Sequence, residues 1–308
     1  MLADRLSPQT YRRITLAALV ALAFIVVTGS LVRLTGSGLG CPSWPTCDEG
    51  RIVAPLEYHA LIEFVNRLVT GLVSVAVMLA VLGSLARRPR RRDLTWLSLG
   101  LVAGVIGQIV LGGLVVLFHL FPPLVMGHFV LSMLLIWCAT VLHHRAGEPD
   151  GGERRPAVGP EFTSLARLLV AMGGLAILLG TVVTGSGPHA GSRDGELVER
   201  LPLAVRDVTR FHGVAAMLFL AAVVVTVVRL RREGNPRVER RAQVLLAVLA
   251  AQAGVGYLQY FTGVPALLVA VHIAGATAVW VATIRLSLAT TVAVPNGLAP
   301  PSEKLVLA

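Results

Sequence analysis

Eight long apolar runs constrain the fold of this chain more than any other feature of its sequence. A helix needs about 20 mostly apolar residues to cross the hydrocarbon core of a bilayer. Because every backbone polar group in the bilayer must be bonded within the protein, such runs form helices. With 55% apolar and only 14% charged residues, the sequence predicts an all-α membrane protein with eight transmembrane helices. The runs are Ile14–Val32, Leu61–Leu85, Leu94–Leu117, Leu124–Leu142, Leu165–Thr184, Val208–Val228, Ala242–Phe261 and Ala266–Leu286.

The distribution of arginine predicts how these helices lie in the cell membrane. Arginine clusters follow the second, fourth and sixth runs, whereas the linkers 119–123 and 263–265 contain no arginine or lysine. The linkers 34–60 and 186–207 carry few arginines, which acidic residues partly offset. Since basic linkers stay in the cytoplasm, we expect both termini there. The net charge of +10 then reflects topology, so membrane lipid and no nucleic acid is the expected partner. The polar tail from Pro295 is expected to be disordered.

The two halves of the chain resemble each other. Thr-Gly-Ser-Gly occurs twice, at 35–38 and 184–187, and a glutamine precedes a histidine by 20 residues in both halves, as Gln108–His128 and Gln252–His272. The offset between the halves drifts only from 149 to 144 residues. An even number of spans per half gives both the same orientation, so we predict two repeated four-helix bundles. The predicted parts are an N-terminal half at 1–145, a cytoplasmic linker at 146–164, a C-terminal half at 165–290 and a cytoplasmic tail at 291–308.

Three histidines lie inside the apolar runs, namely His128, His212 and His272. An imidazole in hydrocarbon is costly unless it has a partner. His212 and His272 lie at matching depth near the outer ends of their runs, and haem iron is a partner that takes two facing histidines. We therefore predict that both bind a haem, as ligands of a six-coordinate iron suited to electron transfer. The alternative is a pair of hydrogen-bonded core histidines.

The N-terminal half offers a different pair of side chains. His128 corresponds to His272 and is predicted to bind iron as well, whereas the counterpart of His212 is Asn66, a poor ligand for iron. An incompletely ligated metal is what substrate chemistry requires. The asymmetry predicts that the N-terminal half carries out a reaction and that the C-terminal half relays electrons.

Glu63 lies three residues before Asn66, so the two share one face of a helix. A carboxylate inside a span is a functional candidate, and Glu63 could take up or supply protons during an oxidation. The alternative is a purely structural ion pair between Glu63 and Arg67, four residues apart. Arg67 is also a candidate to bind a haem propionate. His59, one turn before Glu63, is a displaced ligand, a proton partner or an interfacial histidine.

Three cysteines are present, and two of them share one linker. Cys41 and Cys47 fall in a linker predicted to be external, where disulfides persist, so we favour a disulfide. Unpaired thiols and a metal-binding pair are the alternatives, although no nearby cluster of ligands supports a zinc site. Cys138 lies in an apolar run and is expected to be a small core residue.

These residues resemble those of the haem A synthase family, the membrane enzymes that oxidise haem O to haem A for cytochrome oxidase. The resemblance spans essentially all eight predicted helices. Its most specific part is Val32-Arg33-Leu34-Thr35-Gly36-Ser37-Gly38-Leu39-Gly40-Cys41-Pro42-Ser43-Trp44-Pro45-Thr46-Cys47, and the other matching residues are Ile62-Glu63-Phe64, His128, His212 and His272.

The resemblance implies a role for each half. His212 and His272 would bind haem b, and the N-terminal half would hold the substrate haem O near His128, with Glu63 as the catalytic carboxylate. The reaction would oxidise the C8 methyl group of the porphyrin stepwise to a formyl group, using external electron carriers. The family pattern is Glu-x-x-His-Arg, and here Asn66 replaces its histidine, a departure that resembles the actinobacterial subgroup.

Two other functions fit the same histidines. One is a cytochrome b-type electron carrier, and the other is a haem transporter or chaperone that binds haem without chemistry. For a haem A synthase, the expected partners are a haem O synthase that donates the substrate and an electron carrier. The sequence leaves the formation of homo-oligomers open.

Overall fold

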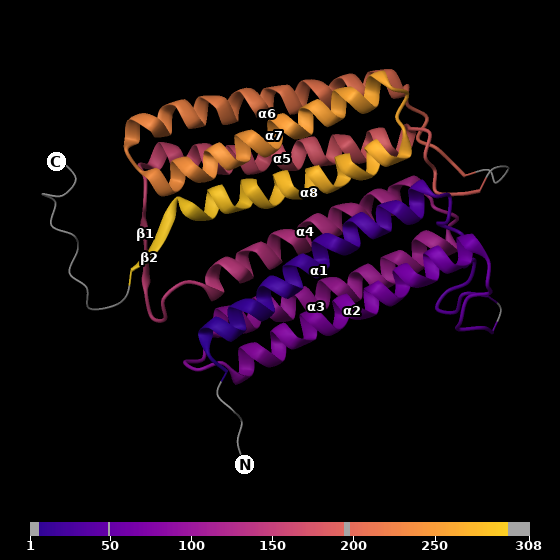
Figure 1. The fold of residues 1–308 in the computed structure, drawn as a ribbon, viewed down its shortest axis with the longest axis horizontal. Helices are drawn as coiled ribbons and strands as arrows, with labels where there is room; N and C mark the ends of the chain where they lie inside the picture. Colours follow the sequence, from indigo (N-terminus) through magenta and orange to yellow (C-terminus); the bar gives the residue numbers. More distant parts are fainter. Residues whose placement is uncertain (1–5, 49, 194–197, 295–308) are drawn as a thin grey trace, which may run out of the picture.

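The computed structural model describes residues 6–48, 50–193 and 198–294, and it is dominated by helices (Figure 1). Eight helices in the described residues are long and apolar enough to cross a membrane, which confirms an α-helical, multi-pass membrane protein. They are α1 (Pro8–Leu34), α2 (Tyr58–Ala86), α3 (Arg92–Leu117), α4 (Pro122–Ala146), α5 (Pro160–Ser186), α6 (Val205–Glu233), α7 (Pro236–Phe261) and α8 (Ala266–Ala289).

Several of these helices begin before the apolar runs that predicted them, because their first turns are capped by polar residues and proline. Ser7 caps α1 by accepting a hydrogen bond from the amide of Thr10, and Asn235 caps α7 by accepting one from the amide of Val238. Proline occupies the first turn of α1, α4, α5 and α7. Hydropathy alone does not predict these helix ends, because they extend beyond the hydrocarbon core.

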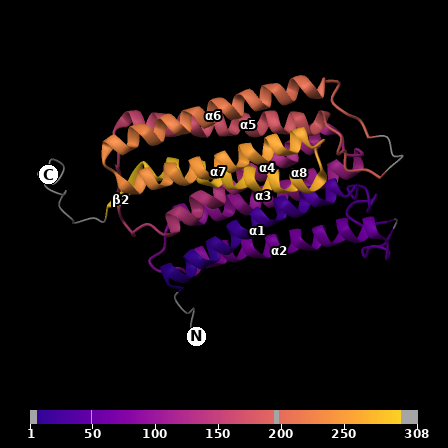
Figure 2. The ribbon, with the colours of Figure 1, turned by 45° about the horizontal axis from the view of Figure 1, so that its top comes forward.

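The helices pack as two groups of four that lie side by side (Figures 1 and 2). Helices α1–α4 contact one another in one group, α5–α8 in the other, and the groups meet where α1 and α4 pack on α8 and where α4 packs on α5. In this interface the indole of Trp280 donates to the carbonyl of Met133 at 2.9 Å and meets Trp137 edge to face, with 5.7 Å between ring centroids. Arg33, in the last turn of α1, also joins the two groups by donating to the carbonyl of Thr184 at 3.1 Å.

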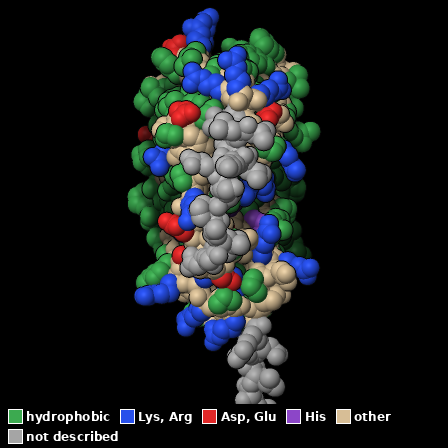
Figure 3. All heavy atoms as spheres, turned by 90° about the vertical axis from the view of Figure 1, so that its left-hand side faces the viewer, with side chains coloured by type: hydrophobic (Ala, Val, Ile, Leu, Met, Phe, Trp, Pro, Cys, Tyr) green, Lys and Arg blue, Asp and Glu red, His purple; other side chains and the backbone are tan. Residues whose placement is uncertain are grey.

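One end of the molecule carries the arginine-rich turns, and we call it the arginine end (Figure 3). A short antiparallel sheet lies there, in which β1 (Glu153–Pro156) pairs with β2 (Thr291–Val294). The sequence does not predict this sheet, because strands of four residues are too short to give a periodic signal. The segment 146–164 therefore contains β1 and the start of α5, and β2 belongs to the segment 291–308; the expected disorder from Pro295 lies outside the described residues.

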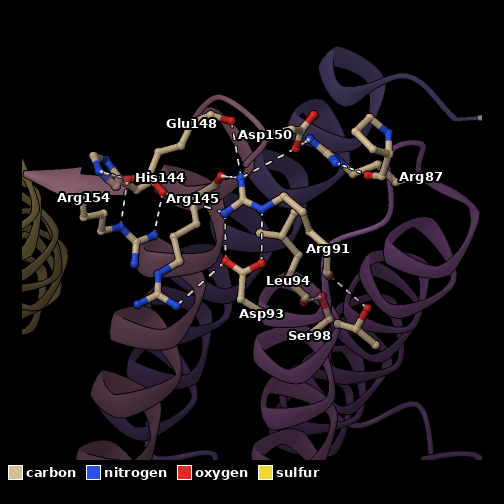
Figure 4. A network of polar contacts seen from close by, with 12 residues as sticks. Arg87, Arg91, Asp93, Leu94, Ser98, His144, Arg145, Glu148, Asp150 and Arg154 are labelled. Atoms are coloured by element: carbon tan, nitrogen blue, oxygen red, sulfur yellow. Dashed lines mark hydrogen bonds and ion pairs between the residues drawn. The ribbon is translucent and has the colours of Figure 1, made fainter. Parts of the chain in front are cut away.

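Ion pairs hold the linker between α4 and β1 against the turn between α2 and α3 (Figure 4). Arg87 is fully buried and pairs with Asp150 at 2.7 Å. Glu148 accepts from Arg154 at 2.6 Å and lies 3.9 Å from the guanidinium of Arg91. A cavity of about 420 Å³ lies beside this network. Arginines that served only as topology markers in the sequence thus also fix the linker between the two groups.

Candidate functional site

His212 and His272 face each other in the C-terminal group. His212 comes from α6 and His272 from α8, and their ring centroids lie 6.3 Å apart with the ring planes at 73°. An iron ion between two imidazole nitrogens, each about 2 Å away, requires a centroid separation of about 6 Å. The separation of the two rings therefore matches that of two imidazoles on one iron ion, and it also lies within the range of an edge-to-face pair of rings.

The surroundings of the two rings also fit iron ligands. Nδ1 of His212 lies 3.0 Å from the carbonyl oxygen of Ala176, the type of outer hydrogen bond that orients a ligating imidazole. Nδ1 of His272 is buried without a hydrogen-bond partner in the described part of the chain. The described residues contain no group of three or more His, Cys, Asp or Glu side chains that would hold a bare metal ion. A metal bound by two imidazoles alone needs its other ligands from a prosthetic group, and a porphyrin supplies them.

A glycine on a neighbouring helix lies under each histidine ring. A methyl group added at Gly180 would come within 3.3 Å of Cε1 of His212, and one added at Gly256 within 3.2 Å of Cε1 of His272. These distances are shorter than ordinary van der Waals contacts, so a methyl group at either position would displace the ring by a few tenths of an ångström. Glycines near Gln252 are evident in the sequence, but their spacing does not indicate this role.

The N-terminal group repeats this arrangement with one changed side chain. Gly112 of α3 lies under His128, at 3.3 Å from Cε1 to an added methyl group, and Nδ1 of His128 is buried without a described partner. Gly29 of α1 lies under Asn66, whose Nδ2 would be 3.9 Å from a methyl group added there. Asn66 thus lies over a glycine of the preceding helix, as His212 does, and its Oδ1 is buried without a described partner.

Two glutamines make equivalent hydrogen bonds in the two halves. Nε2 of Gln108 donates to the carbonyl of His128 at 3.1 Å, and Nε2 of Gln252 donates to the carbonyl of His272 at 2.8 Å. Each bond ties a helix to the turn that carries the histidine. The 20-residue spacing noted in the sequence is therefore the spacing of a physical contact.

Glu63 and Arg67 lie on α2 and form the ion pair that the sequence offered as the alternative to a catalytic role, with 2.6 Å between Nη2 and Oε1. The second carboxylate oxygen of Glu63 accepts from the amide of Cys41 at 2.8 Å. Arg67 also donates to the carbonyls of Cys41, Ser43 and Thr46 at 2.9–3.2 Å. Both side chains therefore bind the linker between α1 and α2, and no hydrogen bond between Glu63 and His128 occurs in the described residues.

The cysteines follow the favoured prediction. Cys41 and Cys47 form a disulfide and are both buried. Cys138 is a free thiol that packs in the span, at 3.5 Å from the carbonyl of Leu97. His59 is held by the hydroxyl of Ser37 at 2.9 Å from its Nδ1. Trp44, in the disulfide-closed ring, lies against Gly113 of α3, a contact that the sequence did not reveal.

Comparison with known proteins places these residues in a family. A family model described as COX15-CtaA, cytochrome oxidase assembly protein, matches residues 12–59 and 52–284. Those ranges extend from α1 to α8 and include Glu63, Asn66 and all three membrane histidines. The chain belongs to the COX15-CtaA family. The resemblance to haem A synthases that the sequence motifs indicated is thereby confirmed.

Curated relatives of this COX15-CtaA member carry the name heme A synthase. The Listeria welshimeri protein is 28% identical over 267 residues, which cover 82% of this chain and 87% of the relative. The Lysinibacillus sphaericus protein is 32% identical over 119 residues, 38% of this chain and 39% of the relative. The Bacillus licheniformis protein is 32% identical over 136 residues, 44% of this chain and 45% of the relative.

Proposed function

We propose that this chain is a haem A synthase, which oxidises the C8 methyl group of haem O to a formyl group and so supplies haem A for cytochrome oxidase. The observation that carries the proposal is the asymmetry between two matching sites. In each site two side chains from different helices each lie over a glycine. The C-terminal site has two imidazoles in these positions, whereas the N-terminal site has one imidazole and one amide. The names of the curated relatives support the same reaction.

In this proposal the C-terminal site holds haem b. His212 and His272 would hold it through their imidazole rings, and neither residue is left to bind a substrate. A haem with two imidazole ligands transfers electrons. The hydrogen bond between His212 and the carbonyl of Ala176 would fix the ring in the orientation that ligation needs.

The N-terminal site would hold haem O as the substrate. His128 would bind it from one face, and Asn66 would leave the opposite face weakly ligated. The hydrogen bond from Gln108 to the carbonyl of His128 would fix the depth of the ring in the span. The sequence also offered Arg67 as a residue that binds a haem propionate. In the structure its guanidinium donates to Glu63 and to three carbonyls instead.

Glu63 is the proposed catalytic carboxylate. Conversion of a methyl to a formyl group adds an oxygen atom from a co-substrate, water or dioxygen, and removes protons as well as electrons to an external carrier, so a nearby base is needed. Glu63 is almost fully buried and within one helical turn of Asn66. Its Oε2, now bonded to the amide of Cys41, is the atom at which it would hold a proton; its Oε1 would stay with Arg67.

The proposed location is the cell membrane, with both termini in the cytoplasm. Arginine side chains gather at the arginine end, which the positive-inside rule assigns to the cytoplasm (Figure 3). In the variant His119→Cys, the new cysteine lies at the end opposite the arginine end, and membrane-impermeant maleimide should label it in intact cells. Labelling of the variant Arg232→Cys instead would show that the protein has the opposite orientation. The proposed partners are a haem O synthase and an electron carrier.

The decisive experiment is extraction of haem from cells that express this chain together with a source of haem O. Cells with the wild-type chain should accumulate haem A. Glu63→Gln keeps the size of the side chain and an oxygen that can accept from Cys41, but it removes the proton-binding carboxylate. Haem A formation should therefore fall by roughly a hundredfold or more.

His119→Ala is the matched control, since His119 is exposed in the turn between α3 and α4. Haem A formation by this variant should equal that of the wild type. If wild-type cells take up electrons into the bound haem but form no haem A, the protein is an electron carrier. If they move unaltered haem across the membrane, it is a transporter.

A further inference from the structure

The ring closed by Cys41 and Cys47 places one large side chain against α3. The indole of Trp44 lies so close to Gly113 that a methyl group added there would be 2.6 Å from Cδ2. Only glycine leaves room for this contact. Trp44 is nevertheless 39% exposed, so one part of the indole packs on the helix and the rest stays at the surface.

A dedicated set of hydrogen bonds fixes the backbone of this ring. Arg67 donates to the carbonyls of Cys41, Ser43 and Thr46, and Glu63 accepts from the amide of Cys41. Every one of these bonds involves a charged side chain, the type of hydrogen bond that is strongest in proteins. The ring that carries Trp44 is therefore anchored to α2 at four backbone atoms.

The contact of Trp44 lies next to the candidate substrate site. Gly113, under the indole, directly follows Gly112, which lies under the ring of His128. Successive residues on a helix point about 100° apart, so Trp44 and His128 meet adjoining faces of α3. The disulfide-closed ring thus contacts α2, which carries Glu63, and α3, which packs against His128.

The C-terminal half lacks this device. Gly112 corresponds to Gly256, since both lie under the histidine 16 residues later, and so Gly113 corresponds to Tyr257. The linker 186–207 contains neither a cysteine nor a tryptophan. The ring therefore serves the half that we propose to exchange its haem, and is missing from the half that we propose to retain it.

We propose that Trp44, seated on Gly113 and held by Arg67, is a closing element over the N-terminal haem site that retains the substrate. Arg67 is then a positioning residue, because it acts through the ring that carries Trp44. The inference rests on the proposed function, since it takes haem O as the occupant of this site. It goes further by assigning substrate retention to Trp44, Gly113 and Arg67.

The test measures haem loss, so its result is independent of haem A formation. The purified full-length protein is loaded with haemin, and transfer of haemin to excess apomyoglobin is followed by absorbance. Trp44→Ala should release haem from the His128 site about tenfold faster than the wild type, because contacts of this kind act mainly on dissociation. Gly113→Ala should do the same by displacing the indole, and Arg67→Gln by releasing the ring.

Two comparisons make the test specific. Ile52→Ala removes an exposed apolar side chain from the same linker and should leave haem loss unchanged. The double variant Trp44→Ala, Gly113→Ala should lose haem no faster than Trp44→Ala alone, since the added methyl group then has no indole to displace.

Unchanged haem loss in Trp44→Ala would overturn the inference. So would multiplied effects in the double variant, or an equal acceleration at the six-coordinate His212–His272 site, which would indicate general loosening of the bundle. If haem loss behaves as expected but wild-type cells form no haem A, the closing element stands and the proposed function fails.

Discussion

The two candidate haem sites differ in the side chain that faces the histidine. His212 and Asn66 occupy equivalent positions, each over a glycine of the preceding helix, yet only the imidazole is a good ligand for iron. The proposed division between electron transfer and substrate oxidation therefore depends on Asn66.

Asn66→His should turn the N-terminal site into a second bis-imidazole site. Position 66 faces Gly29 as His212 faces Gly180, so the ring of the variant would also lie over a glycine. The absorption spectrum should gain a second six-coordinate haem, and haem A formation should fall by about tenfold or more because the open position at the iron is lost. A variant with a wild-type spectrum would show that Asn66 does not face the iron.

The positions of Asn66 and His212 could be predicted from the sequence because the two halves of the chain resemble each other and can be compared. Subtracting the repeat offset from His212 led to Asn66 without any structure. The same reasoning left Glu63 open between a catalytic group and a structural pair. It missed the role of Arg67, since an arginine that binds three carbonyls of a distant linker leaves no mark on local spacing.

At the scale of helices, close approach at glycine sets the distance between the histidine rings and their neighbours. Gly256 and Gly254 lie two residues apart on α7, but only Gly256 lies under His272; an added methyl group at Gly254 would contact nothing within 4 Å. The pair offers a matched comparison within one helix.

Gly256→Ala should displace the His272 ring by a few tenths of an ångström and lower haem retention in the C-terminal site by roughly tenfold, as changes around a ligating histidine do. Gly254→Ala should leave retention at the wild-type value. The measurement is the amount of six-coordinate haem that remains bound after purification. Equal effects of the two substitutions would mean that the contact under His272 does not support the ligand.

The spans were predictable at this scale because each apolar run exceeds the thickness of the bilayer core. Their ends were not, because Ser7, Asn235 and the first-turn prolines extend the helices into polar surroundings. The pairing of β1 with β2 joins segments far apart in the sequence, and Arg87 binds Asp150 in the linker before β1 from a third segment. Such contacts depend on the packed bundle and carry no local pattern.

At the scale of the whole molecule, two groups of four helices present equivalent sites at the same end of the bundle. Arg33, in the last turn of α1, and Trp280, midway along α8, join the two groups, so the sites are held in one frame. A fixed frame suits electron transfer from one site to the other. The central claim is that imidazoles from different helices hold iron within this frame.

The absorption spectrum of the purified protein, reduced and oxidised, tests that claim most directly. The wild-type protein should be coloured and should show a six-coordinate haem. His212→Ala and His272→Ala should each abolish that signal, whereas His128→Ala and His119→Ala should retain it. A colourless wild-type protein, or a six-coordinate signal that survives the loss of either His212 or His272, would contradict the account.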